Sequence, residues 1–279
     1  MDYEFVTTEQ HYGKCSNAPD LRGLVIPGKR GKLLGLLYTA AGAGPHPVAV
    51  LLHGIPGNEK NLDIGQALRR AGFHVVLFHY SGSWGSDGSY AFGHNLEDAN
   101  SVLDYILRDT SLGFDPSHIY AVGHSLGGFV CAQLAAHRPE IRAAALLMPC
   151  DIGRIWQNER EYPSAAQIQK EVLVSSQPWL SGTSPDRLLD ELRRHSEDYR
   201  FENIAGLLAA KPLLLIKAAY DRFTPPVCHS DPLERAIHAA GGNLLSSCTL
   251  PTDHFAGDHR LALSALVTDF LGKQYRAAL

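Results

Sequence analysis

The sequence of 279 residues lacks several features that would define other classes of protein. It has no apolar run long enough to cross a bilayer, and its first residues, MDYEFVTTEQ, lack the apolar core of a signal peptide. It also has no basic tract, and its formal net charge is −4, so nucleic acid is not an expected partner. No HExxH sequence and no cluster of His and Cys residues is present, so no metal site or cofactor is expected.

The few cysteines exclude a disulfide framework. Their number is odd and none forms a CxxC pair; they are Cys15, Cys131, Cys150, Cys228 and Cys248. We therefore expect a reducing, cytoplasmic setting. Nothing in the sequence defines an oligomeric state.

What the sequence does contain is an ordinary globular composition, with 45% hydrophobic and 19% charged residues. Two early segments, 21–26 and 32–38, are separated by a Pro-Gly turn and are predicted strands. Later apolar runs suit strands that are buried on both faces; they occur at 48–54, 74–80, 118–124 and 142–149. Two more strands are predicted at 211–221 and 243–251. Helical spacing is found at 59–71, 96–108, 231–240 and from about 257. The alternation predicts an α/β fold with a mostly parallel central sheet flanked by helices.

Residues 151–205 break this alternation. The segment is rich in charge, and prolines divide it into short predicted helices. Ligands of open α/β sheets bind beyond the carboxyl ends of the strands, so we expect this insertion to form a helical cap over that edge. The α/β core would then comprise 1–150 and 206–279. The alternative is a set of surface helices that touch no substrate.

The most specific stretch is IYAVGHSLGGFV at 119–130, which places a G-x-S-x-G pattern between a predicted strand and a predicted helix. A nucleophile on such a sharp turn needs glycine on both sides, because larger side chains would collide with the turn. Ser125 is therefore the predicted nucleophile. His124 is not the expected base, because neighbouring side chains on this turn point apart.

Three stretches together resemble the α/β-hydrolase family of serine hydrolases over nearly the whole chain. They are HGIPGN at 53–58, HYSGSWGSDGSY at 79–90 and the GHSLG motif itself. The second stretch is especially similar to esterases and to small relatives of the prolyl-oligopeptidase type. Many relatives have arginine where this chain has Ser81, which weakens a peptidase assignment. The resemblance implies hydrolysis of a carboxylic ester, or else of a peptide or amide, in a small-molecule substrate and without a cofactor.

The resemblance also implies an oxyanion hole with two backbone donors. One is the N–H of Leu126, directly after the nucleophile. The other comes from the 53–57 loop, where Pro56 has no N–H, so Ile55 is the expected donor and Gly57 the reserve. His53 is expected to organise this loop.

In this family the triad runs serine, acid, histidine along the chain. Asp221 follows the strand after the insertion and is the predicted acid, with Asp151 as the alternative. The base is chosen between His254 and His259. His259 is expected inside the first turns of the last helix, whose positive end disfavours an imidazolium, whereas His254 is expected in the preceding loop. His254 is therefore the predicted base.

Aromatic residues are the remaining candidates for substrate contact. Trp84, Trp156 and Trp179 are expected to bind substrate, although large aromatic side chains serve equally well to anchor a cap to its core. A different class of function is a non-catalytic binding protein that keeps the fold.

Overall fold

The computed structural model of the protein describes residues 3–12 and 17–279, so Cys15 lies outside the described residues. The described chain contains one eight-stranded sheet. Across the sheet the strands are β1 (Asp20–Gly28), β2 (Gly31–Thr39), β4 (His74–Phe78), β3 (His46–Leu52), β5 (Phe114–His124), β6 (Ile141–Leu147), β7 (Leu213–Ala218) and β8 (Leu245–Leu250).

The strand directions confirm a mostly parallel sheet. Only β2 runs against its neighbours β1 and β4, and the pairs from β4 to β8 are parallel. In the centre, Leu51 of β3 lies opposite Leu77 of β4 on one side and Val122 of β5 on the other. All parallel strands therefore end at the same edge of the sheet, where loops from different strands meet.

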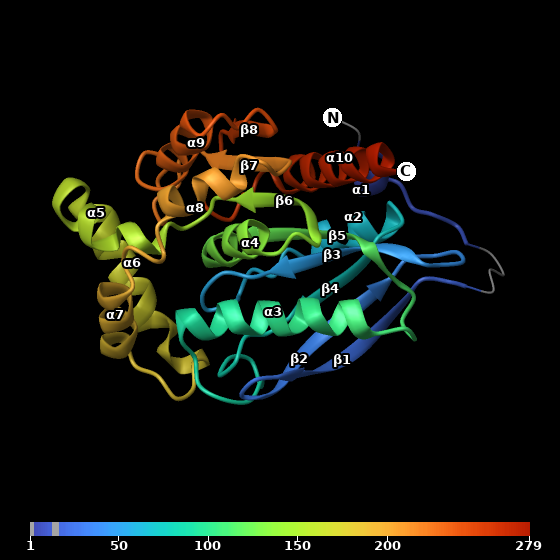
Figure 1. Cartoon of the computed structure of the whole chain (residues 1–279), viewed down its shortest axis with the longest axis horizontal. Helices are drawn as coiled ribbons and strands as arrows, with labels where there is room; N and C mark the ends of the chain where they lie inside the picture. Colours follow the sequence, from blue (N-terminus) through green and yellow to red (C-terminus); the bar gives the residue numbers. More distant parts are fainter. Residues whose placement is uncertain (1–2, 13–16) are drawn as a thin grey trace.

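Helices cover both faces of the sheet (Figure 1). One layer contains α1 (Glu4–Thr7), α2 (Leu62–Arg70) and α10 (Arg260–Ala278); the other contains α3 (Phe92–Arg108), α4 (Leu126–His137), α8 (Phe201–Leu208) and α9 (Ser230–Ala239). The strands serve both layers because alternate side chains point to opposite faces. In β3, Val48 and Val50 enter one apolar core while Ala49 and Leu51 enter the other.

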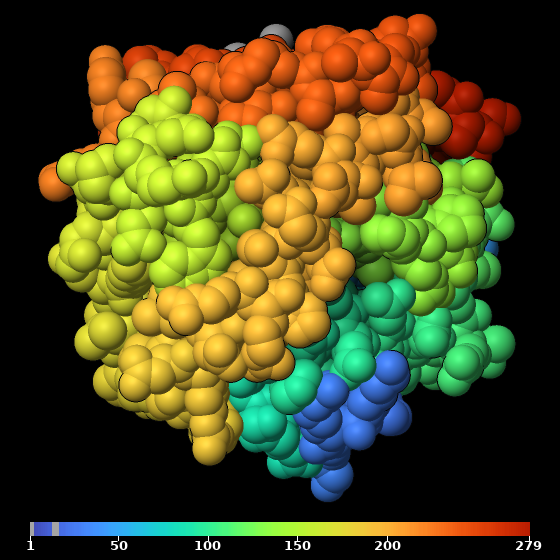
Figure 2. Space-filling view, turned by 60° about the vertical axis from the view of Figure 1, so that its left-hand side comes forward, coloured from blue at the N-terminus to red at the C-terminus, as the bar shows by residue number. Residues whose placement is uncertain are grey.

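The segment between β6 and β7 forms α5 (Ile155–Glu161), α6 (Pro163–Ser176) and α7 (Pro185–Arg194), with short 3₁₀ turns at Ile152–Arg154 and Gln177–Trp179. These three helices gather beyond the edge where the parallel strands end (Figure 1). Figure 2 shows the segment, coloured yellow-green to amber, spread over the face of the molecule that is turned forward.

Helix α8 crosses the predicted boundary at residue 205. Its buried residues Phe201, Ile204 and Leu208 join the core cluster, and the helix packs against α4 and α9. By its contacts α8 thus belongs with the helices on the sheet, and the segment beyond the sheet edge ends before it.

Candidate active site

Ser125 occupies the sharp turn between β5 and α4. Its backbone angles are φ 58° and ψ −121°, a strained region for a residue with a side chain. An added Cβ on Gly123 would lie 2.1 Å from the Gly127 carbonyl oxygen, and one on Gly127 would lie 1.9 Å from that of Leu52. Both glycines of the motif are therefore needed for close approach of backbone segments.

Backbone hydrogen bonds fix this turn in place. The Ser125 N–H donates to the Leu147 carbonyl oxygen at 3.0 Å. The Ser125 carbonyl oxygen accepts from the N–H groups of Gly128 and Cys150, both at 2.9 Å. Such support from two neighbouring segments holds a strained backbone in one conformation and leaves the half-buried side chain facing a cavity.

His254 and Asp221 form a buried pair. The His254 Nδ1 lies 2.8 Å from the Asp221 Oδ2, and Asp221 also accepts from the N–H groups of Phe223 and Thr224 at 2.9 and 2.8 Å. Burial raises the pKa of Asp221. The hydrogen bond and charge of His254, together with the hydrogen bonds from the backbone and side chain of Thr224, nevertheless hold this pKa below its ordinary value. The carboxylate therefore accepts a hydrogen bond from Nδ1–H, which leaves His254 Nε2 as the ring nitrogen that can take up a proton.

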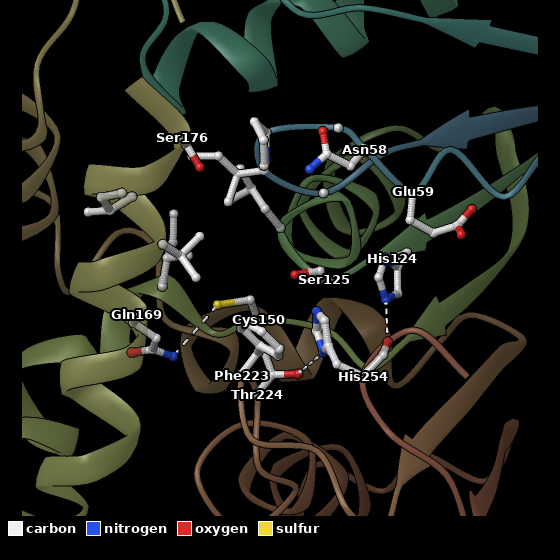
Figure 3. A pocket seen from close by; sticks show the side chains of 18 of the residues that line it. Asn58, Glu59, His124, Ser125, Cys150, Gln169, Ser176, Phe223, Thr224 and His254 are labelled. Carbon is white, nitrogen blue, oxygen red and sulfur yellow. Dashed lines mark hydrogen bonds between the residues drawn. The ribbon is translucent and has the colours of Figure 1, made fainter. Parts of the chain in front are cut away.

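Ser125 and His254 line the same cavity, from β5–α4 and from the loop after β8 (Figure 3). Within the described chain no hydrogen bond joins the Ser125 hydroxyl to His254, which is common in a site without substrate. His124 donates from Nε2 to the His254 carbonyl oxygen at 2.8 Å, because a carbonyl can only accept. The histidine beside the nucleophile in sequence therefore supports the loop that carries His254.

His259 lies outside this cavity. It is the residue before α10, which begins at Arg260 rather than near Gly257 as predicted. The loop extends further because Asp253 Oδ1 accepts from the N–H groups of Phe255 and Gly257. The His259 Nδ1 lies 3.0 Å from the Oδ1 of neighbouring Asp258.

Asp151 is buried at a different place. Its carboxylate accepts from the N–H groups of Gly153 at 3.2 Å and Phe201 at 3.3 Å, and burial raises its pKa to about 7. The structure thus brings Asp221, and not Asp151, to the His254 ring.

Two backbone N–H groups beside Ser125 have no acceptor within the described residues. They belong to Leu126, the first residue of α4, and to Ile55. The first N–H groups of a helix lack intrahelical partners and carry partial positive charge. Both residues line the cavity, so these are the two predicted oxyanion donors.

The loop that carries Ile55 is held by two side chains beneath it. His53 is buried, its Nδ1 lies 2.7 Å from the Gly54 carbonyl oxygen, and burial lowers its pKa to about 3. Trp84 donates from Nε1 to the Pro56 carbonyl oxygen at 2.5 Å. A neutral, buried His53 serves the shape of the loop, as the sequence indicates.

The cavity has a volume of about 210 Å³. Its walls come from the 54–59 loop, the start of α3, the turn at Ser125, helices α5 to α7, and the loops after β7 and β8. The aromatic side chains that line it are Phe92, Phe223 and Phe255.

The three tryptophans predicted to bind substrate lie outside this lining. Trp84 holds the 54–59 loop, as described above. Trp156 packs against the core beneath the cations of Arg193 and Lys170, at 4.8 and 5.4 Å from its ring centroid. Trp179 is 43% exposed. Packing, the alternative use of large aromatic side chains, accounts for Trp84 and Trp156.

Gln169, which was not predicted from the sequence, lines the cavity from α6 and contacts the ring of His229. His229 is buried, burial lowers its pKa to about 4, and its Nδ1 accepts from the Asp151 N–H at 3.0 Å. The proton of this neutral ring is therefore on Nε2, which lies 2.7 Å from the Gln169 amide. The amide must present its oxygen there. Gln169 also approaches Cys150 Sγ (Figure 3), and no motif marks this long-range contact.

Two further findings concern the described part of the chain. It contains no group of three or more His, Cys, Asp and Glu side chains placed to hold a metal ion. None of its helices is long and apolar enough to span a membrane.

The sheet order, the sharp turn at Ser125 and a family comparison all indicate the same class of protein. Residues 47–184, just under half of the chain, match the family model described as alpha/beta hydrolase fold. The chain has the α/β-hydrolase fold, and the resemblance found in its sequence is confirmed.

Individual relatives are more distant. Cutinase est1 of Thermobifida alba is 26% identical over 129 residues, which cover 44% of this chain and 42% of the cutinase, so the match spans less than half of that relative. Brefeldin A esterase, a bacterial homologue of human hormone sensitive lipase, superposes with a TM-score of 0.69 at 16% identity, over 98% of this chain and 82% of that one. Pyrococcus horikoshii acylaminoacyl peptidase gives a TM-score of 0.65 at 16% identity, over 92% and 41%.

Proposed function

We propose that the protein is a serine carboxylesterase with Ser125, His254 and Asp221 as its catalytic triad. The observation that carries this proposal is the buried His254–Asp221 pair, 2.8 Å between Nδ1 and Oδ2, in the cavity that also contains the strained Ser125. Asp221 holds the ring with Nδ1 protonated, so Nε2 faces the cavity as the base.

The reaction has two halves. Ser125 Oγ attacks the ester carbonyl carbon while His254 Nε2 takes the hydroxyl proton. The N–H groups of Leu126 and Ile55 stabilise the oxyanion that forms. His254 then gives its proton to the leaving alcohol, and the C–O bond breaks. A water molecule attacks the acyl-enzyme, loses its proton to His254, and the acid leaves as Ser125 recovers its proton.

An ester is the preferred bond because the cutinase relative is a sequence match and the esterase neighbour covers nearly the whole chain. The alternative is a peptidase or amidase of the prolyl-oligopeptidase-like type with the same triad, which the likeness to an acylaminoacyl peptidase supports. Ser81 bears on this choice. Its N–H and hydroxyl donate to the buried Asp98 at 2.7 and 2.9 Å. The loop thus has serine where many relatives have arginine, which weakens the peptidase alternative.

We also propose that helices α5 to α7 act as a cap. Residues of all three line the cavity, among them Ile155, Leu173 and Leu192, so a substrate beside Ser125 would touch this segment. The surface-helix alternative predicts that changes on the cavity face of α6 leave substrate preference unaltered.

The decisive experiment is labelling with a fluorophosphonate probe, followed by identification of the modified residue. We expect stoichiometric labelling of Ser125 and none in Ser125→Ala, which should remain folded by circular dichroism. Absence of labelling in the folded native protein would favour a non-catalytic binding protein. A panel of p-nitrophenyl esters beside aminoacyl and peptidyl anilides separates the two enzymes, because faster anilide cleavage would favour the peptidase.

A further inference from the structure

One face of α6 forms a wall of the cavity. Gln169, Val172, Leu173 and Ser176 line the cavity, and their spacing of three and four residues places them in one row on the helix. The row has polar side chains at its two ends and apolar side chains between them. Figure 3 shows Ser176 and Gln169 apart from one another on the side of the pocket from which α6 comes.

The two polar ends of this row differ in their partners. Gln169 contacts the His229 ring, as described above. Ser176 is only 1% exposed, and its hydroxyl has no hydrogen-bond partner among the described residues. Its neighbour Ser175 also lines the cavity, but it is exposed and donates to the Val172 carbonyl oxygen at 3.1 Å. An unpaired buried hydroxyl is unfavourable, so its retention in a cavity wall indicates a group that pairs with it when the cavity is filled.

The rest of the cavity limits what that group can be. Apolar side chains such as Phe92, Leu173 and Leu192 form much of the wall. No Lys or Arg side chain of the described residues lines it, and its one acidic residue is Glu59. An anionic substituent would be buried without a counter-charge, so a neutral group is favoured. A cavity of about 150 Å³ holds benzene, so the observed 210 Å³ suits one ring on a short linker.

We propose that Ser176 is a specificity residue that hydrogen-bonds a neutral hydroxyl on the acyl group of the substrate. The substrate class is then an ester of a compact, ring-containing acid with a hydroxyl distant from the carbonyl. We assign the acyl group because it must stay in the cavity until water attacks, whereas the alcohol leaves first. This inference rests on the proposed esterase function.

The test compares matched pairs of substrates. Ethyl esters of phenylacetic, 3-phenylpropanoic and 4-phenylbutanoic acid are each assayed with and without a para-hydroxyl group, so that the linker length is scanned. Native protein, Ser176→Ala and Ser164→Ala are compared; Ser164 is on the same helix but exposed and outside the cavity lining. For at least one linker we expect kcat/KM to favour the hydroxylated ester by about tenfold, in the native protein and in Ser164→Ala. In Ser176→Ala the ratio should fall to near one, with the plain ester still cleaved.

Two outcomes overturn the proposal. One is equal cleavage of both members of every pair, and the other is a preference that survives in Ser176→Ala. If no ester of this panel is cleaved, labelling of Ser125 by the fluorophosphonate probe still decides the esterase proposal, and binding decides the role of Ser176. Calorimetry then measures both esters with Ser125→Ala and with the double variant Ser125→Ala, Ser176→Ala. Preferential binding of the hydroxylated ester that depends on Ser176 supports the subsite, and equal binding rejects it.

Discussion

The surroundings of His254 and His259 decide which ring takes part in the proposed reaction. His254 is 4% exposed, pairs with Asp221 and lines the cavity, whereas His259 is the residue before α10 and pairs with Asp258. We expect His254→Ala to reduce kcat by at least about 10³-fold, because the hydroxyl of Ser125 then lacks its base.

His259→Ala is the matched control and should retain most of the activity. Steady-state hydrolysis of one p-nitrophenyl ester by the two variants provides the comparison. A large loss in His259→Ala with little loss in His254→Ala would reverse the assignment of the base.

The two buried aspartates are distinguished in the same way. In Asp221→Asn the backbone N–H groups that bond Oδ1 would retain the amide oxygen, so an NH₂ donor would face His254 Nδ1 in place of the Oδ2 acceptor. We therefore expect kcat to fall by roughly 10³–10⁴-fold. Asp151→Asn alters a carboxylate that, among the described residues, accepts hydrogen bonds from the backbone of Gly153 and Phe201 alone, and the kcat of this variant should stay within about tenfold of the native value. The opposite order of losses would make Asp151 the acid.

At the scale of elements, the turn between β5 and α4 depends on contacts that a single methyl group would break. An added Cβ on Gly123 would lie 2.1 Å from the Gly127 carbonyl oxygen and 2.5 Å from Cys131 Cβ. We expect Gly123→Ala to lower the free energy of unfolding by at least about 2 kcal/mol. Urea denaturation followed by circular dichroism measures this loss.

Gly206 on α8 is the matched control for that substitution. It is exposed, and an added Cβ would meet nothing within 4 Å. Because alanine favours a helix over glycine, Gly206→Ala should raise the free energy of unfolding by roughly 0.5–1 kcal/mol. Equal effects at the two positions would mean that the turn has room for a side chain.

The helices and strands could be predicted from the sequence, whereas the residues that form the cavity wall could not. Apolar runs and helical spacing define all eight strands and the main helices, because burial on one or two faces leaves a periodic pattern. The short α1 and the exact start of α10 carry no such pattern. The pairing of Gln169 with His229 and the unpaired Ser176 depend on how α6 docks, so no local signal could reveal them.

At the scale of the whole molecule, buried histidines connect stability to pH. Burial lowers the pKa of His53 and His124 to about 3 and that of His229 to about 4. These rings stay neutral in the folded protein at pH 5, whereas the unfolded chain protonates them below about 6.5. The unfolded state then binds more protons, so stability falls as the pH falls below about 6.5. Asp151, with its pKa raised to about 7, acts in the opposite sense and offsets one of these protons.

Counting these groups alone, three imidazoles less one carboxyl leave about two protons, so between about pH 6 and 4.5 the free energy of unfolding should fall by at least about 2 kcal/mol per pH unit. Urea unfolding at pH 6.0, 5.5 and 5.0 measures this slope. His124→Gln should reduce it by about 1.4 kcal/mol per pH unit, whereas His195→Gln, at a position where 42% of the side chain is exposed, is the control and should change it less. Identical slopes in both variants would contradict the burial argument.

The proposed catalytic groups and the proposed specificity residues lie on different segments of the chain. The groups proposed to break the bond lie shortly after β5, β7 and β8, while the row on α6 lines another wall of the cavity, where we propose that it contacts the part of the substrate that does not react. Exchanging the side chains at 169, 172, 173 and 176 as a set should therefore give variants that differ in substrate specificity but share one reaction mechanism. Substitutions in this one helix during evolution would change substrate specificity in the same way.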